Sequence, residues 1–347
     1  MDPTSAIPGS HSPFTNEYNP STLREAVYDQ KTIPILRECL DLTRAHAPRE
    51  YEETRNLVFT DMLQIQELRL IEHMLDNGYM SVSEVEPWFI RQHASKEVVE
   101  LLLVRGWDIN MQDRKSFRDP TETEGGDRLL DYCVREYLPG GNGDLARWLV
   151  AEKGATPDGF TGAQDHKEPP PVLNEVAQFG TVSLYKFLEE HGASPSPRVL
   201  HLAVDIAASM RVDPSTPDGK EPVSEYNFRN NDDGGSMANR AEMVRFLVEE
   251  RGLDVNGIDS DVSHAPMKTH FGTPIAYAAG SLHGAKVVAW LLEKGADPTI
   301  RGPCWPTQNA YDRARGNQAF EVLTVLHAPE EYFVGLRTVT TLGTKEG

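Results

Sequence analysis

Apolar residues along this chain recur at the i, i+3, i+4 spacing of packed helices, in short runs that end at a glycine. Two examples are the run from Val98 to Leu103 and the run from Val287 to Leu292. The glycines that end such runs are Gly78, Gly106, Gly154, Gly192, Gly252 and Gly295. A helix that stops abruptly needs a left-handed residue beyond its last turn, and glycine adopts this conformation without steric cost. The pattern predicts helices that end alike and bury an apolar stripe against neighbouring units.

A second, shorter helix is predicted before each of these helices, and its signal is clearest at residues 272–281. Thr273 is placed to cap the first turn, and Pro274 occupies the first helical position, where its missing N–H costs nothing. Ala278 and Ala279 then allow a close approach between helices. Pairs of this kind are also predicted at 127–157 and 171–195, with a degenerate opening unit at 23–42 and a closing one at 309–326.

The stretch from Thr273 to Thr299, with TPIAYAA, VVAWLL and GADPT in succession, resembles the ankyrin repeat. RVLHLAV at 198–204 matches the start of an ankyrin first helix, with His201 in the slot where the family uses histidine for structural hydrogen bonds. The resemblance covers most of residues 23–327. It implies an all-α ankyrin-repeat solenoid of about six to eight helix-turn-helix units with short hairpins. Divergent units broken by long loops are similar in style to ankyrin proteins of filamentous fungi.

The six glycines that end these helices are unevenly spaced along the chain, so insertions must interrupt the array. Segments rich in Pro, Gly, Asp, Ser and Asn are typical of surface loops. We place such insertions at 114–127, 159–171, 210–240 and 260–270. The longest, 210–240, falls between the two helices of one unit. Residues 1–22 are expected to be disordered, and residues 328–347 to form a C-terminal tail.

The composition narrows the choice of partner. A formal charge of −19, from 34 basic and 53 acidic residues, disfavours direct binding of nucleic acid. It suits a protein partner with a basic face, although the acidic surplus also serves solubility. The three cysteines, Cys39, Cys133 and Cys304, are too scattered for a zinc site or a disulfide framework. No signal sequence or long apolar run occurs, so we expect an intracellular protein, cytoplasmic or nuclear, without membrane contact.

Catalytic signatures are missing from the sequence: it contains no GxSxG, HExxH, P-loop or dinucleotide fingerprint. His201 and Asp205 lie one helical turn apart and could act as a base and its orienter, but the resemblance implies a structural histidine. The glycine-rich segment 139–144 is interpreted as a turn, and the acidic segment 230–235 as a solvated loop. We expect no metal and no cofactor. The alternative hypothesis is an unusual enzyme whose site forms between the 210–240 insertion and the array.

Ankyrin repeats generally bind proteins through hairpin tips and the exposed side of their first helices. The residues that match those positions here are Met111, Gln112, Asp113, Arg114, Lys115, Asp259, His270, Phe271, Arg301 and Trp305. Trp305 is either an interface anchor or a packing residue of the closing unit. Among the other tryptophans, Trp88, Trp148 and Trp290 are expected in the core, and Trp107 packs on the preceding unit or points outward. The resemblance thus implies a non-catalytic scaffold or adaptor, in the narrower version a regulator or coregulator in signalling or transcription.

Overall fold

The computed structural model describes the chain with several gaps, and it divides into two compact units, Met1–Met111 and Gln112–Gly347. The predicted disordered segment 1–22 lies outside the described residues. Within the described part the regular structure is helical, and the only β-type pairing is an isolated bridge between Gln112 and Arg128. The predicted all-α class is therefore confirmed for this part of the chain. The described residues are 37, 40–41, 44–45, 48–113, 126–135, 143–158, 171–219, 235–259, 272–302 and 308–333.

The first unit is built on α3, which packs against both α4 and α5, while α4 also packs against α6. Its core contains Phe59 and Leu63 from α3 and Ile71 and Met74 from α4, all fully buried. The elements of this unit are α3 (Pro48–Gln64), α4 (Leu68–Asp76), the 3₁₀ turn η2 (Val82–Glu84), α5 (Pro87–Ile90) and α6 (Lys96–Val104).

The second unit is a succession of helix pairs. Its pairs are α7 (Leu129–Val134) with α8 (Asp144–Lys153), α9 (Val172–Phe179) with α10 (Val182–Glu190), α11 (Val199–Ser209) with α12 (Gly235–Arg245), α13 (Pro274–Ala279) with α14 (Ala285–Glu293), and α15 (Ala310–Gly316) with α16 (Phe320–Val325). Helix α12 continues as the π-helical turn η3 (Phe246–Glu250), and the 3₁₀ turn η4 (Glu330–Phe333) follows α16.

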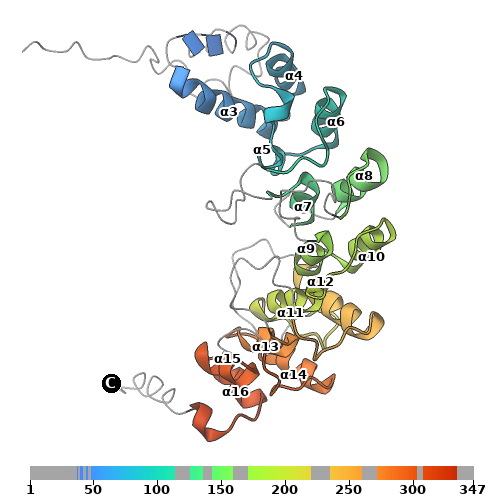
Figure 1. Cartoon of the computed structure of the whole chain (residues 1–347), viewed down its shortest axis with the longest axis vertical. Coiled ribbons are helices and arrows are strands. Elements are labelled where there is room, and N and C mark those ends of the chain that lie inside the picture. The colour runs from blue at the N-terminus through green and yellow to red at the C-terminus, as the bar shows by residue number, and fades with distance from the viewer. Residues whose placement is uncertain are drawn as a thin grey trace, which may run out of the picture. The chain divides into compact units, whose positions relative to one another are not determined.

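Successive pairs stack on one another through their first helices. Helix α9 packs on α7, α11 on α9, α13 on α11 and α15 on α13. The second helices form a row beside them, in which α10 packs on α8 and α12, and α16 on α14 (Figure 1). Small residues permit this stacking, since Ala203 and Ala207 of α11 and Ala276 and Ala279 of α13 are buried. Each pair thus buries its apolar stripe against its neighbours.

The predicted glycine endings are confirmed. All six glycines have positive φ, between 64° and 97°, and a Cβ atom added at any of them would meet nothing within 4 Å. These positions therefore favour glycine because of its left-handed backbone conformation, and not because a larger side chain would clash with a neighbour. The following amide closes the helix by donating to a carbonyl of the last turn, as from Ala155 to Leu149 and from Ala296 to Leu291, both at 3.0 Å.

Four further helix ends use the same backbone without glycine. Gln66, Arg211, Gln318 and His327 have φ between 52° and 60°. The residue after each donates to a last-turn carbonyl, for example Ala319 to that of Ala314 at 2.8 Å. A search for glycine cannot find these ends, because the left-handed conformation costs an ordinary residue only about 1–2 kcal/mol, which tertiary packing can offset.

Exchanging residues at two of these ends should shift stability in opposite directions. We expect Gly154→Ala to lower the free energy of unfolding by about 1 kcal/mol, because alanine must adopt a φ of 76°. Gln318→Gly, at an exposed position, should raise it by up to about 1 kcal/mol. Urea unfolding of the three proteins measures both changes. Equal stability of all three would contradict the steric explanation.

Parts of the predicted insertion 210–240 and of the predicted tail 328–347 form regular structure. Helix α12 begins at Gly235, inside the predicted insertion 210–240, because its polar Arg240 is buried and donates to the carbonyls of Gln178 and Gly180. Residues 210–219 are also ordered by the guanidinium of Arg245, which donates to the Thr216 carbonyl at 2.6 Å. The segment 220–234 lies outside the described residues. The predicted tail starts with η4, which packs on α15.

Among the tryptophans in the described ranges, only Trp88 departs from the predictions. Trp148 and Trp290 are buried, as expected. Trp107 is 4% exposed and its Nε1 donates to the Val85 carbonyl at 2.8 Å, so it packs inward. Trp88 was expected in the core but is only half-buried on the short helix α5. Four residues are too few for the helical spacing to show which side of α5 faces inward.

Candidate functional site

The polar stretches after the helix-ending glycines form tips with a common local structure. In three of them the second residue after the glycine is an aspartate, whose carboxylate accepts the amide of the residue two positions on at 2.8–2.9 Å. These aspartates are Asp108, Asp254 and Asp297. Such Asx turns shape the tips from within, so these carboxylates serve the backbone first.

Neighbouring tips of the second unit are also joined to each other. The amide of Ser194 donates to both carboxylate oxygens of Asp158, each at 3.0 Å. Asn256 makes two such bonds: its Oδ1 accepts the amide of Asp297 at 2.7 Å, and its Nδ2 donates to the carbonyl of Gly295 at 3.0 Å. These bonds fix the tip after Gly154 to the tip after Gly192, and the tip after Gly252 to the tip after Gly295.

Asp259, a predicted partner contact, is unavailable to a partner because it is fully buried. Its Oδ2 accepts the Tyr277 hydroxyl at 2.6 Å and the Arg198 Nε at 2.8 Å, and its amide donates to the carbonyl of Gly272 at 3.0 Å. Burial, followed by this carboxylate, raises the pKa of Tyr277. The prediction rested on the position of Asp259 within the tip. That position does not reveal that Tyr277, on the following helix α13, covers the carboxylate.

The same arrangement recurs at the start of the second unit. Asp113 is buried, its Oδ2 accepts the Tyr132 hydroxyl at 2.5 Å, and its amide donates to the carbonyl of Asp127 at 3.1 Å. In both places the aspartate is the seventh residue after a helix-ending glycine, and the tyrosine lies on the following first helix. An Asp at this position is thus a structural latch between tip and helix.

The other predicted contacts are only partly described. The Arg301 side chain is 51% exposed, and its Nη1 lies 2.9 Å from Oδ2 of Asp312. Met111 is half-buried in the first unit, and Gln112 is half-buried in the second, where it forms the bridge to Arg128. The remaining predicted contacts, Arg114, Lys115, His270, Phe271 and Trp305, lie outside the described residues.

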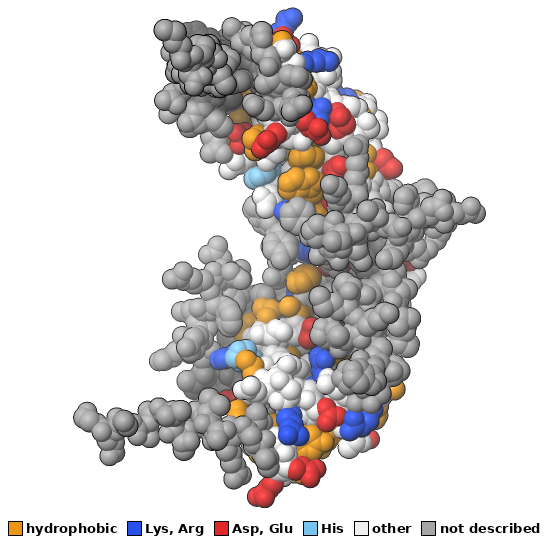
Figure 2. Space-filling view, turned by 60° about the vertical axis from the view of Figure 1, so that its left-hand side comes forward, with side chains coloured by type: hydrophobic (Ala, Val, Ile, Leu, Met, Phe, Trp, Pro, Cys, Tyr) orange, Lys and Arg blue, Asp and Glu red, His pale blue; other side chains and the backbone are white. Residues whose placement is uncertain are grey.

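Among the first helices of the second unit, α11 presents a partly open row of side chains. Helices α7 and α13 are buried along their length, whereas α11 exposes Asp205 and Ser209 and partly exposes Leu202 and Ile206. These four residues follow the helical repeat and lie along one side of α11. Figure 2 shows hydrophobic, acidic and basic side chains interspersed on the face in view. The row on α11 itself combines an acidic, a hydroxyl and two apolar side chains, and such a mixture suits recognition of a protein better than of a single charged group.

His201 is structural, as the resemblance implies. It is 2% exposed, and its Nε2 lies 2.9 Å from the carbonyl of Gly257. Because a carbonyl only accepts hydrogen bonds, this nitrogen carries the proton. The ring also meets Tyr277 edge-on, with centroids 5.3 Å apart. Burial lowers the pKa of His201 below its ordinary value of 6.5. A histidine held in this way is not placed to act as the base of the alternative enzyme hypothesis.

The lowered pKa of His201 predicts a pH dependence of stability. Below pH 6.5 the unfolded chain takes up a proton that the folded chain does not, so the free energy of unfolding should decrease as pH falls and reach its plateau above pH 6.5. In His201→Gln, whose amide can still donate to Gly257, this part of the slope should be missing. Urea unfolding between pH 5 and pH 8 measures it. Identical slopes in both proteins would contradict the assignment.

Buried arginines are the feature that sequence reasoning missed. Arg128 is 1% exposed; it pairs with both carboxylate oxygens of Asp131 at 2.9–3.0 Å and donates to the carbonyls of Thr156, Pro157 and Asp158. Arg135 joins a carboxylate that precedes α7 to one on the next first helix: its Nη1 lies 2.6 Å from Asp127, and its Nε lies 2.8 Å from Glu175. These pairs fasten α7 to the tip after α8 and to α9.

The described residues contain no group of three or more His, Cys, Asp or Glu side chains able to hold a metal ion. Cys133 is buried, and its burial, with a smaller contribution from Asp131, raises the pKa of its thiol, so it is not a reactive nucleophile. None of the helices in the described ranges is long and apolar enough to span a bilayer. In comparisons with known proteins, no family model and no curated protein matches the chain.

Proposed function

We propose that this chain is a non-catalytic protein-interaction scaffold or adaptor of the ankyrin type, which binds a protein partner through its tips and first helices. The observation that carries the proposal is the recurrence of one unit, with paired helices, a left-handed ending and a polar tip, which in two places is fastened to the next tip. Such arrays offer an extended surface whose shape is fixed before binding.

The narrower version of this proposal is a regulator or coregulator that assembles other proteins in the cytoplasm or the nucleus. The net charge of −19 supports a partner with a basic face over nucleic acid. An enzyme built on His201 is not favoured by any contact of that residue, since its ring is buried and bonded to a backbone carbonyl. The proposal therefore needs no cofactor and no metal.

Affinity purification with charge-reversed variants tests the proposal. Asp205→Lys with Ser209→Lys changes the exposed row of α11, and Glu190→Lys is the matched control on the second-helix row. We expect the wild type and the control to retain a defined, stoichiometric partner that the double variant loses. A Trp305→Ala, Phe271→Ala variant tests the predicted tip contacts in the same way. Absence of any stoichiometric partner from the wild type at low and moderate salt would overturn the proposal.

A further inference from the structure

Two Asn-Gly pairs lie in the described part of the chain, one in each compact unit. They are Asn77-Gly78 and Asn256-Gly257. An asparagine before glycine is chemically labile, because the small glycine lets its backbone nitrogen reach the side-chain carbon of the asparagine. A third pair, at 142–143, begins outside the described residues. The rate at which such a pair reacts depends on how firmly the fold holds both of its residues.

The pair Asn256-Gly257 is tied to its neighbours by several hydrogen bonds. The side-chain amide of Asn256 bonds to the next tip through both of its ends: Nδ2 donates to the Gly295 carbonyl at 3.0 Å, and Oδ1 accepts the Asp297 amide at 2.7 Å. The Gly257 carbonyl accepts the Nε2 proton of His201 at 2.9 Å. A Cβ atom added at Gly257 would lie 3.1 Å from a backbone oxygen, so this backbone is also closely surrounded. Reaction at Asn256 therefore requires its tip to open first.

The pair Asn77-Gly78, at the end of α4, is exposed at both residues. Asn77 is the C-cap of α4, and its Nδ2 donates to the His73 carbonyl at 2.8 Å and to Nδ1 of the same residue at 3.1 Å. These bonds stay within the last turn of its own helix. The Gly78 amide donates to the Leu75 carbonyl at 3.3 Å, and a Cβ atom added at Gly78 would meet nothing within 4 Å. The pair can therefore rotate into a reactive geometry without displacing a neighbouring helix.

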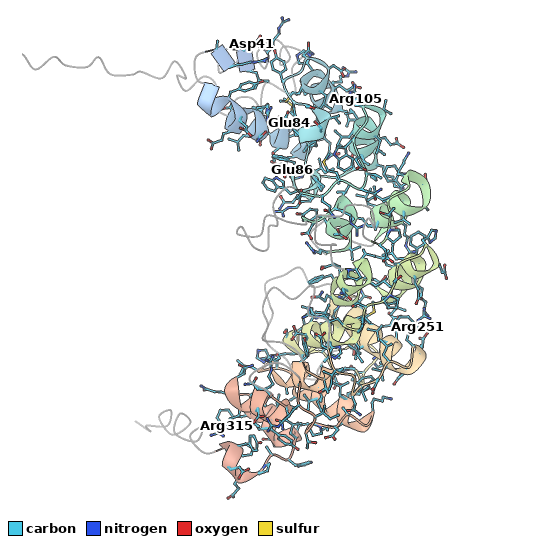
Figure 3. The ribbon with its side chains drawn as sticks, viewed as in Figure 1. Asp41, Glu84, Glu86, Arg105, Arg251 and Arg315 are labelled. Atoms are coloured by element: carbon cyan, nitrogen blue, oxygen red, sulfur yellow. The ribbon has the colours of Figure 1, made fainter. Side chains whose placement is uncertain are left out.

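The residues around this pair are anchored independently of it. The Arg105 guanidinium lies 2.9 Å from the Asp76 carboxylate and 3.2 Å from that of Glu72, and Figure 3 shows Arg105 near α4. Tyr79 and Met80, which follow the pair, are buried, and both of their amides donate to one carbonyl of the last turn. A reaction at residue 77 thus leaves the chain fixed on both sides, so its product can accumulate in the folded protein.

We infer that Asn77 is a site of spontaneous deamidation in the folded chain and that the fold protects Asn256 from the same reaction. The Gly78 nitrogen loses its proton to solvent and forms a bond to Cγ of Asn77. The bond from Cγ to Nδ2 then breaks, and the nitrogen takes a proton from solvent and leaves as ammonia. Water opens the resulting cyclic imide, which leaves aspartate or isoaspartate at residue 77. Water is the co-reactant, and the inference does not depend on the proposed binding function.

Peptide mass spectrometry of the full-length chain, incubated at neutral pH, tests the inference. The conversion of each asparagine is followed over time in buffer and in denaturing urea, and an isoaspartate-specific methyltransferase identifies the isoaspartate. In buffer we expect Asn77 to react about tenfold or more faster than Asn256, because reaction at Asn256 requires local opening. In urea the two rates should converge. Asn77→Gln, which keeps an amide but cannot readily close the same ring, is the matched control and should give no product at residue 77.

Equal rates at the two asparagines in buffer, or the same ratio of rates in buffer and in urea, would overturn the inference, because the fold would then exert no selection. Faster reaction at Asn256 than at Asn77 in buffer would also overturn it.

The product should loosen the end of α4. A carboxylate cannot donate to the His73 carbonyl, and it faces the negative end of the helix dipole. We therefore expect Asn77→Asp, which stands in for the product, to exchange the amide hydrogens of residues 76–80 faster than the wild type, with those of α3 unchanged. Unchanged exchange at residues 76–80 would contradict this consequence of deamidation.

Discussion

Replacing Arg128 with alanine should lower the free energy of unfolding of the second unit by about 3–5 kcal/mol. The side chain is 1% exposed and bonds to both oxygens of Asp131, which is itself buried. Removing it leaves that carboxylate in an apolar environment without its cation and also orphans the carbonyl of Thr156. Truncation of one partner of a buried pair costs far more than the pair contributes in net stability.

The loss should depend on pH in a defined direction. Burial opposes ionisation of Asp131, but the charge and hydrogen bonds of Arg128 outweigh it and hold the pKa of that carboxyl below 3.8. Without Arg128, the burial of Asp131 is opposed by the charge of Arg135 but no longer by a paired guanidinium, so the pKa of Asp131 should rise relative to the wild type. Protonation then relieves part of the stranded charge, and the penalty of the variant should be smaller at pH 4 than at pH 7.

Urea unfolding of wild type and Arg128→Ala at the two pH values measures both effects. The matched control is Lys186→Ala, which removes an ion pair to Glu250 whose side chains are 44% and 61% exposed. Exposed pairs of this kind contribute roughly 0–1 kcal/mol, so the control should remain close to wild type. A loss in Arg128→Ala no larger than in the control would show that the buried pair is not what fastens α7 to its tip.

Replacing Arg135 with alanine should also cost about 3–5 kcal/mol, because two buried carboxylates lose the same guanidinium. Its Nη1 and Nη2 lie 2.6 and 2.9 Å from Asp127, and its Nε lies 2.8 Å from Glu175 of the next first helix. Unlike Arg128, this side chain joins two successive helix pairs, so its loss should weaken their stacking.

A double-mutant cycle separates charge burial from packing. Glu175→Gln in the Arg135→Ala background removes one of the stranded charges, so the double variant should be less destabilised than the sum of the two single variants. The free energy of unfolding in urea is measured for the wild type, the two single variants and the double variant. Hydrogen-exchange protection of α7 and α9 is measured for the same four proteins. Strict additivity would mean that Arg135 acts through its packing alone.

The helix endings show which part of the fold can be predicted from the sequence. The requirement for a left-handed residue is local and steric, so the six glycines can be located without knowledge of the partner helices. Arg211 and His327 adopt the same backbone without being glycine, and only tertiary contacts reveal them. The start of α12 was missed for a related reason: the buried environment of Arg240 is supplied by carbonyls some 60 residues away in sequence.

The candidate site was less predictable because exposure depends on distant residues. Asp259 lies at a tip position that the resemblance assigns to partner contact, but Tyr277 and Arg198 enclose its carboxylate. The sequence around Arg135 is typical of a surface charge, because its buried partner Glu175 lies 40 residues later in the chain. For Trp88, the sequence does not show which side of the four-residue helix α5 faces the core. In the structure Pro87 and Ile90 form the buried side of α5.

The hydrogen bonds from Asp113 to Asp127 and from Asp259 to Gly272 have a consequence for how this chain tolerates change. At each, the backbone departs and returns at two points only 3.0–3.1 Å apart, measured from amide nitrogen to carbonyl oxygen. The packing of the helices on either side therefore does not depend on the number of residues between these two points. The entropic cost of closing the loop increases only slowly with that number. These two positions are natural acceptor sites for foreign sequences, where an epitope or a reporter domain can be grafted without altering the register of the repeats.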